Sequence, residues 1–265
     1  MPKVRTRLIS TLFLPLLLAA SAACDIVTAD FKSQETAEWR KSYQLEAGGR
    51  VEISNVNGKI DVQPSDGNTV EVVATKVGRS GSPEAARQAL ERIEIVESAS
   101  PAAIRIETKV QRGGGFMHMG GTEVRYAVKV PASAQVQFST VNGGIEVLGL
   151  NGRVGLETTN GGIRAREIGG PIEASTTNGG VDVELTQVAE PGVKLECTNG
   201  GIKLRLPGSS KATISASVTN GGIEANGLTI DATETSRRRL SGRLNGGGPS
   251  IRLEGTNGGI QIASR

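Results

Sequence analysis

Apolar and polar residues alternate with period two over most of the chain beyond residue 43, in short runs that end at glycine. Around one glycine pair, Leu156 and Thr158 precede the corner and Ile163 and Ala165 follow it on one face, while charged or polar residues stand between them. This alternation predicts short, half-buried strands. The strands meet at Asn-Gly-Gly, where glycine supplies the positive φ and the close backbone approach that a sharp corner needs.

The Asn-Gly-Gly corner recurs along the second half of the chain. It is found at Asn142, Asn160, Asn178, Asn199, Asn220 and Asn257. The first five asparagines are 18, 18, 21 and 21 residues apart, and the last follows after 37. A fixed period near 20 residues is typical of repeat architectures, so we predict an all-β repeat fold.

Two arrangements fit such a repeat: a meander of antiparallel hairpins, or a single-stranded β-solenoid (β-helix) with coils of about 18–21 residues. The residues four positions after each successive Asn alternate in sign: Glu146, Arg164, Asp182, Lys203 and Glu224. In stacked coils these side chains would lie about 4.8 Å apart, where opposite charges are favourable. A hairpin would pair Glu157 with Arg164, so the charges also permit the meander. We favour the solenoid.

Residues at the same position of successive repeats would form columns in stacked coils, and other such columns also agree with stacking in sequence order. Six positions after the Asn the signs again alternate, at Arg166, Glu184 and Arg205. Three positions before it no two like charges meet, since the residues are Ser139, Glu157, Ser175, Glu196 and Ser217. The column two positions before it is predicted to point inward and has similar volumes throughout: Thr140, Thr158, Thr176, Cys197 and Val218. Cys197 is therefore interpreted as a small core residue, as free cysteines often are.

The first part of the domain shows the same alternation with additions. An Asn-Gly corner stands at Asn57. A short helix is predicted near residues 83–92, because Ser82 can cap it, Pro83 suits its first turn and Glu84 faces the positive end of its dipole. Three further strands are predicted at residues 93–96, 104–110 and 124–130, with a glycine-rich loop before the last.

The N-terminus has the build of a secretory signal peptide. Lys3, Arg5 and Arg7 precede an apolar stretch over residues 8–18 that is too short to span a bilayer. Ser21-Ala22-Ala23-Cys24 then resembles the lipobox of bacterial lipoproteins, although Ser21 stands where an aliphatic residue is usual. We predict acylation at Cys24. The alternative is cleavage after Ala22, which leaves Cys24 as a free thiol.

These segments define the predicted domain organisation. Residues 1–23 form the signal peptide, residues 24–42 a tether and residues 43–265 the β-solenoid domain. Lys and Arg number 30 and Asp and Glu number 27, so removal of the three leader cations leaves 27 of each. A balanced mature chain argues against a nucleic-acid partner. We expect an exported protein of the cell envelope, held to the membrane by its lipid anchor on the periplasmic side or at the cell surface.

Several of these segments together resemble a known family. "AGGRVEISNVNGKIDV", the segment from "GNTVEVVATK" to "ALERIEIVE", the tandem "TTNGGI" units and "LNGGGPSIRLEGTNGGIQI" are similar to the bacterial putative-adhesin family, a β-strand-repeat domain of unknown function. The resemblance covers residues 43–262. It implies a β-helical fold and an exported location, sometimes near envelope-stress regulators. It transfers no catalytic residues.

The residues offer little reaction chemistry, and we predict no enzyme activity, no metal and no cofactor. His118 is the only histidine, which excludes histidine-based triads and sites with several imidazoles. Met117-His118-Met119 could bind a soft metal such as copper, but we interpret it as a loop tip. The corners lack the Gly-Lys-Ser/Thr of a phosphate loop. Glu157 and Glu196 would lie two coils apart, and basic neighbours would keep Asp182 and Glu184 ionised, which suits ion pairs better than acid catalysis.

The candidate binding residues are four arginines where the repeat period breaks, namely Arg237, Arg238, Arg239 and Arg243. Insertions in solenoids usually project from the coil, and guanidinium groups match phosphate and carboxylate geometry. The partners that we expect are an envelope polysaccharide, an anionic lipid or another envelope protein; simple solvation of a charged edge strand is the alternative. The predicted function is a non-catalytic, adhesin-like binding or structural module. The alternatives are a polysaccharide lyase or hydrolase on a β-helix, and an envelope-stress sensor component.

Overall fold

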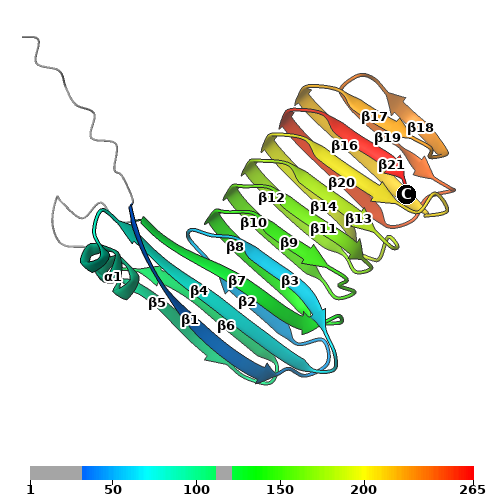
Figure 1. Ribbon diagram of the computed structural model, residues 1–265. Helices are drawn as coiled ribbons and strands as arrows, with labels where there is room; N and C mark the ends of the chain where they lie inside the picture. The colour runs from blue at the N-terminus through cyan, green and yellow to red at the C-terminus, as the bar shows by residue number, and fades with distance from the viewer. Residues whose placement is uncertain (1–31, 112–120) are drawn as a thin grey trace, which may run out of the picture.

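The protein is a β-solenoid made of two long sheets that face each other across an apolar core (Figure 1). The computed structural model describes residues 32–111 and 121–265. At the N-terminal end, long strands and one helix form a broad base, and the short strands of the repeats stack away from it toward the C-terminus. The prediction of an all-β solenoid is confirmed.

The two sheets, called sheet A and sheet B, contain all strands of the described chain. In spatial order, sheet A consists of β1 (Ser33–Gln44), β4 (Thr69–Ser80), β7 (Gly121–Pro131), β3 (Ile60–Ser65), β9 (Ile145–Leu148), β11 (Ile163–Ile168), β13 (Val181–Leu185), β15 (Ile202–Leu206), β21 (Ile260–Ser264) and β17 (Ile223–Asn226). Sheet B consists of β18 (Ile230–Thr235), β19 (Arg239–Leu244), β16 (Ala212–Asn220), β20 (Ser250–Asn257), β14 (Gly192–Asn199), β12 (Ile172–Asn178), β10 (Val154–Asn160), β8 (Gln135–Asn142), β2 (Arg50–Ser54), β6 (Ala103–Val110) and β5 (Ile93–Ala99).

The repeats pair in parallel, coil on coil. Each Asn-Gly-Gly corner passes the chain from a sheet B strand to a sheet A strand, and each strand then pairs with its equivalent in the next coil. Arg164 thus lies between Glu146 and Asp182, as the stacked arrangement predicts. The strands on either side of a corner belong to different sheets, which excludes the hairpin meander.

The broad base adds antiparallel strands to this stack. Strand β1 pairs with β4 along its whole length, so the ordered sheet begins at residue 33, inside the stretch for which a tether was predicted. The predicted helix is α1 (Pro83–Glu91), and Ser82 caps it by accepting a hydrogen bond from the backbone N–H of Ala85. The helix packs closely on β4 at Gly78, where a Cβ would come within 2.3 Å of the Ala86 carbonyl oxygen. The predicted strands correspond to β5, β6 and β7.

The order of the coils in space differs from their order in the sequence, and here the prediction was wrong. The C-terminal coil, β20 and β21, lies between the coil of β14 and β15 and the coil of β16 and β17. Lys203 therefore lies beside Gln261, and Gln261 beside Glu224. The hairpin of β18 and β19 is the physical reason. It pairs antiparallel with the outer edge of β16, which leaves only the inner edge of β16 for the final coil.

The reordering also corrects the prediction for the column that contains the acidic residues. Glu254 of the final coil stands in register with Glu196 on one side and Ser217 on the other. Two like charges therefore meet, contrary to the expectation from sequence order. Each carboxylate is held by a cation two residues earlier on its own strand: Lys194 to Glu196 at 2.9 Å and Arg252 to Glu254 at 2.5 Å.

The corners are joined by a continuous ladder of asparagine amides. From Asn142 onward, each side-chain Nδ2 donates to the Oδ1 of the neighbouring asparagine at 2.7–2.9 Å. In spatial order the ladder runs through Asn57, Asn142, Asn160, Asn178, Asn199, Asn257 and Asn220. The corner asparagines are thus a structural column, because each amide is donor to one neighbour and acceptor for the next.

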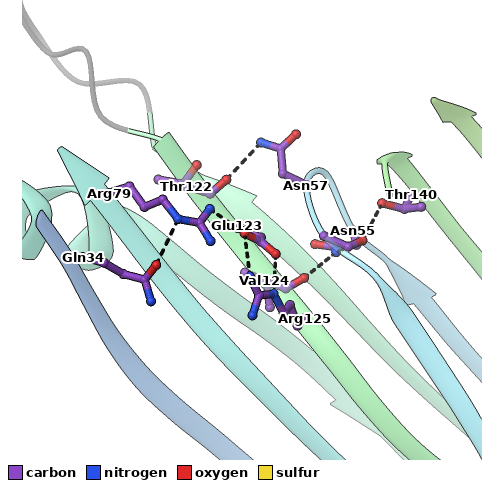
Figure 2. Close-up of polar contacts among 10 residues, drawn as sticks. Gln34, Asn55, Asn57, Arg79, Thr122, Glu123, Val124, Arg125 and Thr140 are labelled. Atoms are coloured by element: carbon purple, nitrogen blue, oxygen red, sulfur yellow. Dashed lines mark hydrogen bonds and ion pairs between the residues drawn. The ribbon is translucent and has the colours of Figure 1, made fainter. Parts of the chain in front are cut away.

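Figure 2 shows the end of the ladder at the base. Asn57 Nδ2 donates to the Thr122 carbonyl at 3.2 Å, and the buried Asn55 Nδ2 donates to the Val124 carbonyl at 2.8 Å. The amides therefore connect the first corner to the start of β7.

The inward column is buried as predicted, but its volumes are not similar throughout, because the reordering places Gly255 between Cys197 and Val218. Thr158 and Thr176 are buried, and each hydroxyl donates to the carbonyl of the first corner glycine of the neighbouring coil, at 2.8 and 2.9 Å. Cys197 takes the same place, with its Sγ 3.1 Å from the Gly179 carbonyl oxygen, and is confirmed as a core residue. Burial raises the pKa of its thiol, which keeps the thiol protonated.

Within residues 32–111 and 121–265, no helix has the length and apolarity to cross a membrane.

The coil order predicts which exposed threonines can be cross-linked. Thr198 and Thr256 precede neighbouring asparagines of the ladder, about 4.8 Å apart, within the Cα separation that a disulfide tolerates. Thr198 and Thr219 are separated by the final coil. We expect the pair T198C and T256C to form a disulfide under mild oxidation, as mapped by mass spectrometry, and the pair T198C and T219C to remain reduced. The opposite pattern would contradict the inserted coil.

Candidate binding surface

The outer face of sheet A has a charged trough across four coils. Its walls are the stacked side chains of Glu146, Arg164, Asp182 and Lys203, in the order predicted from the sequence. Arg164 Nη1 lies 3.1 Å from Glu146 Oε1. The trough has a volume of about 450 Å³ and continues along the sheet toward β3.

The floor of the trough is glycine. The second glycine of each corner contributes to it: Gly144, Gly162, Gly180 and Gly201. The first glycine of each corner allows adjacent corners to lie in close contact. A Cβ at Gly161 would lie only 2.0 Å from the Gly143 carbonyl oxygen, which is too close for any side chain. At Gly200, φ is +148° and a Cβ would lie 1.9 Å from the Gly179 carbonyl oxygen, so no L side chain fits there. The corners leave exposed backbone between rows of charged side chains.

A second row of ion pairs borders the trough. Arg166 Nη2 and Arg205 Nη2 each lie 2.7 Å from an oxygen of Asp182. The same two arginines are 3.5 and 3.6 Å from Glu184, and Arg265 is also 3.5 Å from it. The register of β11 shifts beside Arg166, where Glu167 has a φ of 55°, and this irregularity lets Arg166 reach Asp182 as well as Glu184. These half-buried carboxylates are held by several cations.

At the end of the trough nearest the base, one lysine joins two acidic residues. Asp61 and Glu146 stand in register on neighbouring strands, so two like charges meet. Lys59 Nζ lies 2.6 Å from Asp61 and 3.0 Å from Glu146. Hydrogen bonds to Asp61 and to Glu146 raise the pKa of Lys59 above its ordinary value. The ammonium group thus offsets the repulsion between the carboxylates.

The carboxylates considered as acid catalysts do not have the environment for that role. Glu157 and Glu196 are separated by Ser175 in the stack, and Glu157 is exposed to solvent. Asp182 and Glu184 are enclosed by arginines. A glycosidase acid needs a desolvated carboxyl group, which neither pair provides. Among residues 32–111 and 121–265, no group of three or more metal-binding side chains comes together.

The four candidate arginines lie at the far end of the solenoid. Arg237 and Arg238 form the turn between β18 and β19, while Arg239 and Arg243 lie on β19. The hairpin does not project from the coil as expected. Its turn covers the last corner, since the Arg238 carbonyl accepts from the N–H of Val218 and the Arg237 carbonyl from the N–H of Ile223. The turn therefore occupies the place of a further coil.

The four arginines differ in their partners. Arg243 Nη2 lies 3.2 Å from Asp231, and Arg239 Nη1 lies 3.9 Å from Glu234. In the part of the chain that the structure describes, no carboxylate lies within 4.0 Å of Arg237 or Arg238. Among the four candidate arginines, Arg237 and Arg238 are thus the two whose guanidinium groups have no carboxylate partner in the described chain. Cys24 and His118 lie outside the described residues.

The sequence matches one family model over residues 51–263, almost the whole solenoid: Toastrack DUF4097. The chain belongs to the Toastrack DUF4097 family. This confirms the resemblance found in the sequence, a domain of unknown function. No curated protein matches this sequence.

Solved structures that resemble this Toastrack DUF4097 chain come from bacteria. A putative cell adhesion protein from Clostridium sporogenes is 11% identical, with a TM-score of 0.48, over 87% of this chain and 100% of that chain. A putative adhesin from Bacteroides fragilis is 9% identical, with a TM-score of 0.35, over 86% and 97%. A putative lipid binding protein from Parabacteroides distasonis is 11% identical, with a TM-score of 0.23, over 88% and 97%.

The ion-pair cluster around Glu123, at the base, predicts how stability depends on pH. Glu123 lies 2.6 Å from Arg79 and 2.5 Å from Arg125 (Figure 2). Burial acts to raise the pKa of Glu123, but the hydrogen bonds from Arg125 and Arg79 together lower it below 4.5. Stability from a carboxylate with a lowered pKa is present above the unfolded-state pKa and is lost as pH falls through the folded-state value.

Glu123→Gln should therefore reduce the free energy of unfolding at pH 7 by about 1–3 kcal/mol, and should reduce it less as pH falls below 4.5. Urea unfolding of both proteins between pH 3 and pH 7 measures this. The exposed Glu46→Gln is the matched control, with a change within about 0.5 kcal/mol. A loss that is independent of pH would contradict the assignment.

Proposed function

We propose that this protein is a non-catalytic, adhesin-like binding module of a bacterial cell envelope, exported and anchored to the membrane through acylated Cys24. Its ligand is an extended envelope polysaccharide that lies along the trough of sheet A. The observation that supports this proposal is the trough itself, an open, glycine-floored surface with a charged group at every coil.

The regularity of the trough suits a polymer better than a small molecule. Successive coils repeat about every 4.8 Å along the axis, and each repeat offers one acidic or basic side chain beside exposed backbone. Acidic and basic side chains accept from or donate to sugar hydroxyls, and a row of weak contacts adds up through multivalency. A rigid, elongated solenoid surface is also the usual binding surface of repeat proteins.

Two trough residues can be changed with little effect on the fold. Arg164 is 57% exposed and pairs only with Glu146, and no carboxylate of the described chain lies within 4.0 Å of Lys203. R164A combined with K203A should weaken binding to envelope polysaccharide at least tenfold, because two donors in the trough are lost. Binding to a glycan array, followed by titration of the bound glycan, measures the change.

The control is K109A on β6 of sheet B, an exposed lysine 3.8 Å from Glu107. Its binding should equal that of the unchanged protein, and thermal unfolding should be the same for all three. Equal binding by the trough variant and the control would refute the trough as the ligand site.

A second candidate site is the turn at Arg237 and Arg238, whose guanidinium groups have no acidic partner among the described residues. We propose that it contacts an anionic lipid or an acidic envelope protein at the end of the solenoid. R237A combined with R238A should reduce binding to vesicles containing phosphatidylglycerol and leave glycan binding unchanged. Arg243, which is paired with Asp231, gives the control R243A. Vesicle binding that is equal in the two variants would remove this site.

A further inference from the structure

A pocket on the outer face of sheet B lies on the opposite side of the solenoid from the trough. It has a volume of about 240 Å³ and is formed where β10, β12, β14 and β20 begin. The side chains that matter for its chemistry are those of Arg153, Pro171, Glu173, Pro191, Lys194 and Arg252. Three cations thus surround one carboxylate, next to two proline rings.

The inserted coil places two of these cations side by side. Lys194 of β14 and Arg252 of β20 stand in register on neighbouring parallel strands. Their backbones are about 4.8 Å apart, a separation at which like charges destabilise a sheet. In sequence order β14 would be followed by β16, where the equivalent residue is the uncharged Ser215. The cation pair therefore exists only because the final coil enters at this layer.

On sheet A, one pair of like-charged neighbours is bridged by a residue of opposite charge. Asp61 and Glu146 on sheet A are joined by Lys59, whose Nζ is within 3.0 Å of both carboxylates. No such bridge joins the two cations of sheet B. Lys194 pairs with Glu173 at 3.1 Å and Glu196 at 2.9 Å, while Arg252 pairs with Glu254. Among the described residues, no carboxylate lies within 4.0 Å of both Lys194 and Arg252.

We propose that this pocket binds the carboxylate of an acidic sugar, of the uronic acid type, between Lys194 and Arg252. The ligand's carboxylate would lie between the two cations, just as the ammonium group of Lys59 lies between Asp61 and Glu146 on sheet A. The charges are reversed in the two cases. An arginine fork can bind it through two N–H donors, and the lysine supplies a second charge.

The remaining walls fit the rest of such a ligand. Pro171 and Pro191 present apolar ring surfaces, on which the C–H face of a sugar can pack. Glu173 accepts from sugar hydroxyls, and the Ser250 hydroxyl can donate or accept. Arg153 adds a third cation 3.8 Å from Glu173. The pocket thus combines an anion position, hydroxyl partners and an apolar wall within about 240 Å³.

Isothermal titration calorimetry of the full chain tests the proposal with three probes: trigalacturonate, the neutral trisaccharide maltotriose and inorganic phosphate. Trigalacturonate should bind, and its affinity should fall as salt rises. K194Q combined with R252Q should weaken this binding at least tenfold. R153Q, an exposed single change beside the pocket, should weaken it several-fold and keeps the test open if the double variant unfolds.

The matched control is R164Q combined with K203Q in the sheet A trough, which should bind trigalacturonate as the unchanged protein does. Loss of binding in this control would show that the acidic sugar binds in the trough, and would refute the sheet B pocket while leaving the proposed function intact. Equal binding of maltotriose would refute the role of the carboxylate. If inorganic phosphate bound as tightly as trigalacturonate, that result would refute the assignment of an acidic sugar as the ligand.

Discussion

The structure depends on one constraint, the close contact between successive corners. Each corner brings the first glycine of one coil against a carbonyl of the next, as Gly161 meets Gly143, at a distance that excludes a Cβ. Each corner also presents an asparagine amide that donates to one neighbour and accepts from the other. Buried hydroxyls such as that of Thr158 bind the same carbonyls from inside. Together these three contacts hold successive corners in parallel and in register.

Strict register turns the outer faces into columns of side chains. Along sheet A the charges of Glu146, Arg164 and Asp182 alternate, and the trough combines them with bare glycine backbone. On sheet B the inserted coil breaks the alternation and sets Lys194 beside Arg252. Stacking in register thus gives sheet A a surface with balanced, regularly repeating charges, and gives sheet B a local excess of positive charge.

Much of this fold could be predicted from the sequence, because the responsible interactions are local or periodic. Period-two alternation gave the strands, the Asn-Gly-Gly spacing gave the coils, and the volumes at Thr158, Thr176 and Cys197 gave the inward column.

The coil order could not be predicted. The corners at Asn220 and Asn257 are almost the same in sequence, so either could follow Asn199. The deciding contact is the pairing of β19 with β16, which joins residues far apart in the chain. The sheet B pocket was missed for the same reason, since it exists only in the true order.

The amide ladder can be tested at its centre, where Asn178 donates to Asn160 and accepts from Asn199, both at 2.9 Å. Asn178→Asp keeps the size and removes the donor, and it sets a carboxylate oxygen against the Asn160 oxygen. The account predicts a loss of about 1–3 kcal/mol in the free energy of unfolding at pH 7, measured by urea denaturation. The neighbouring exposed Thr177→Ala should change it by less than about 0.5 kcal/mol. If the Asn178→Asp variant proved as stable as the Thr177→Ala variant, that result would contradict the ladder as the interaction that sets the register.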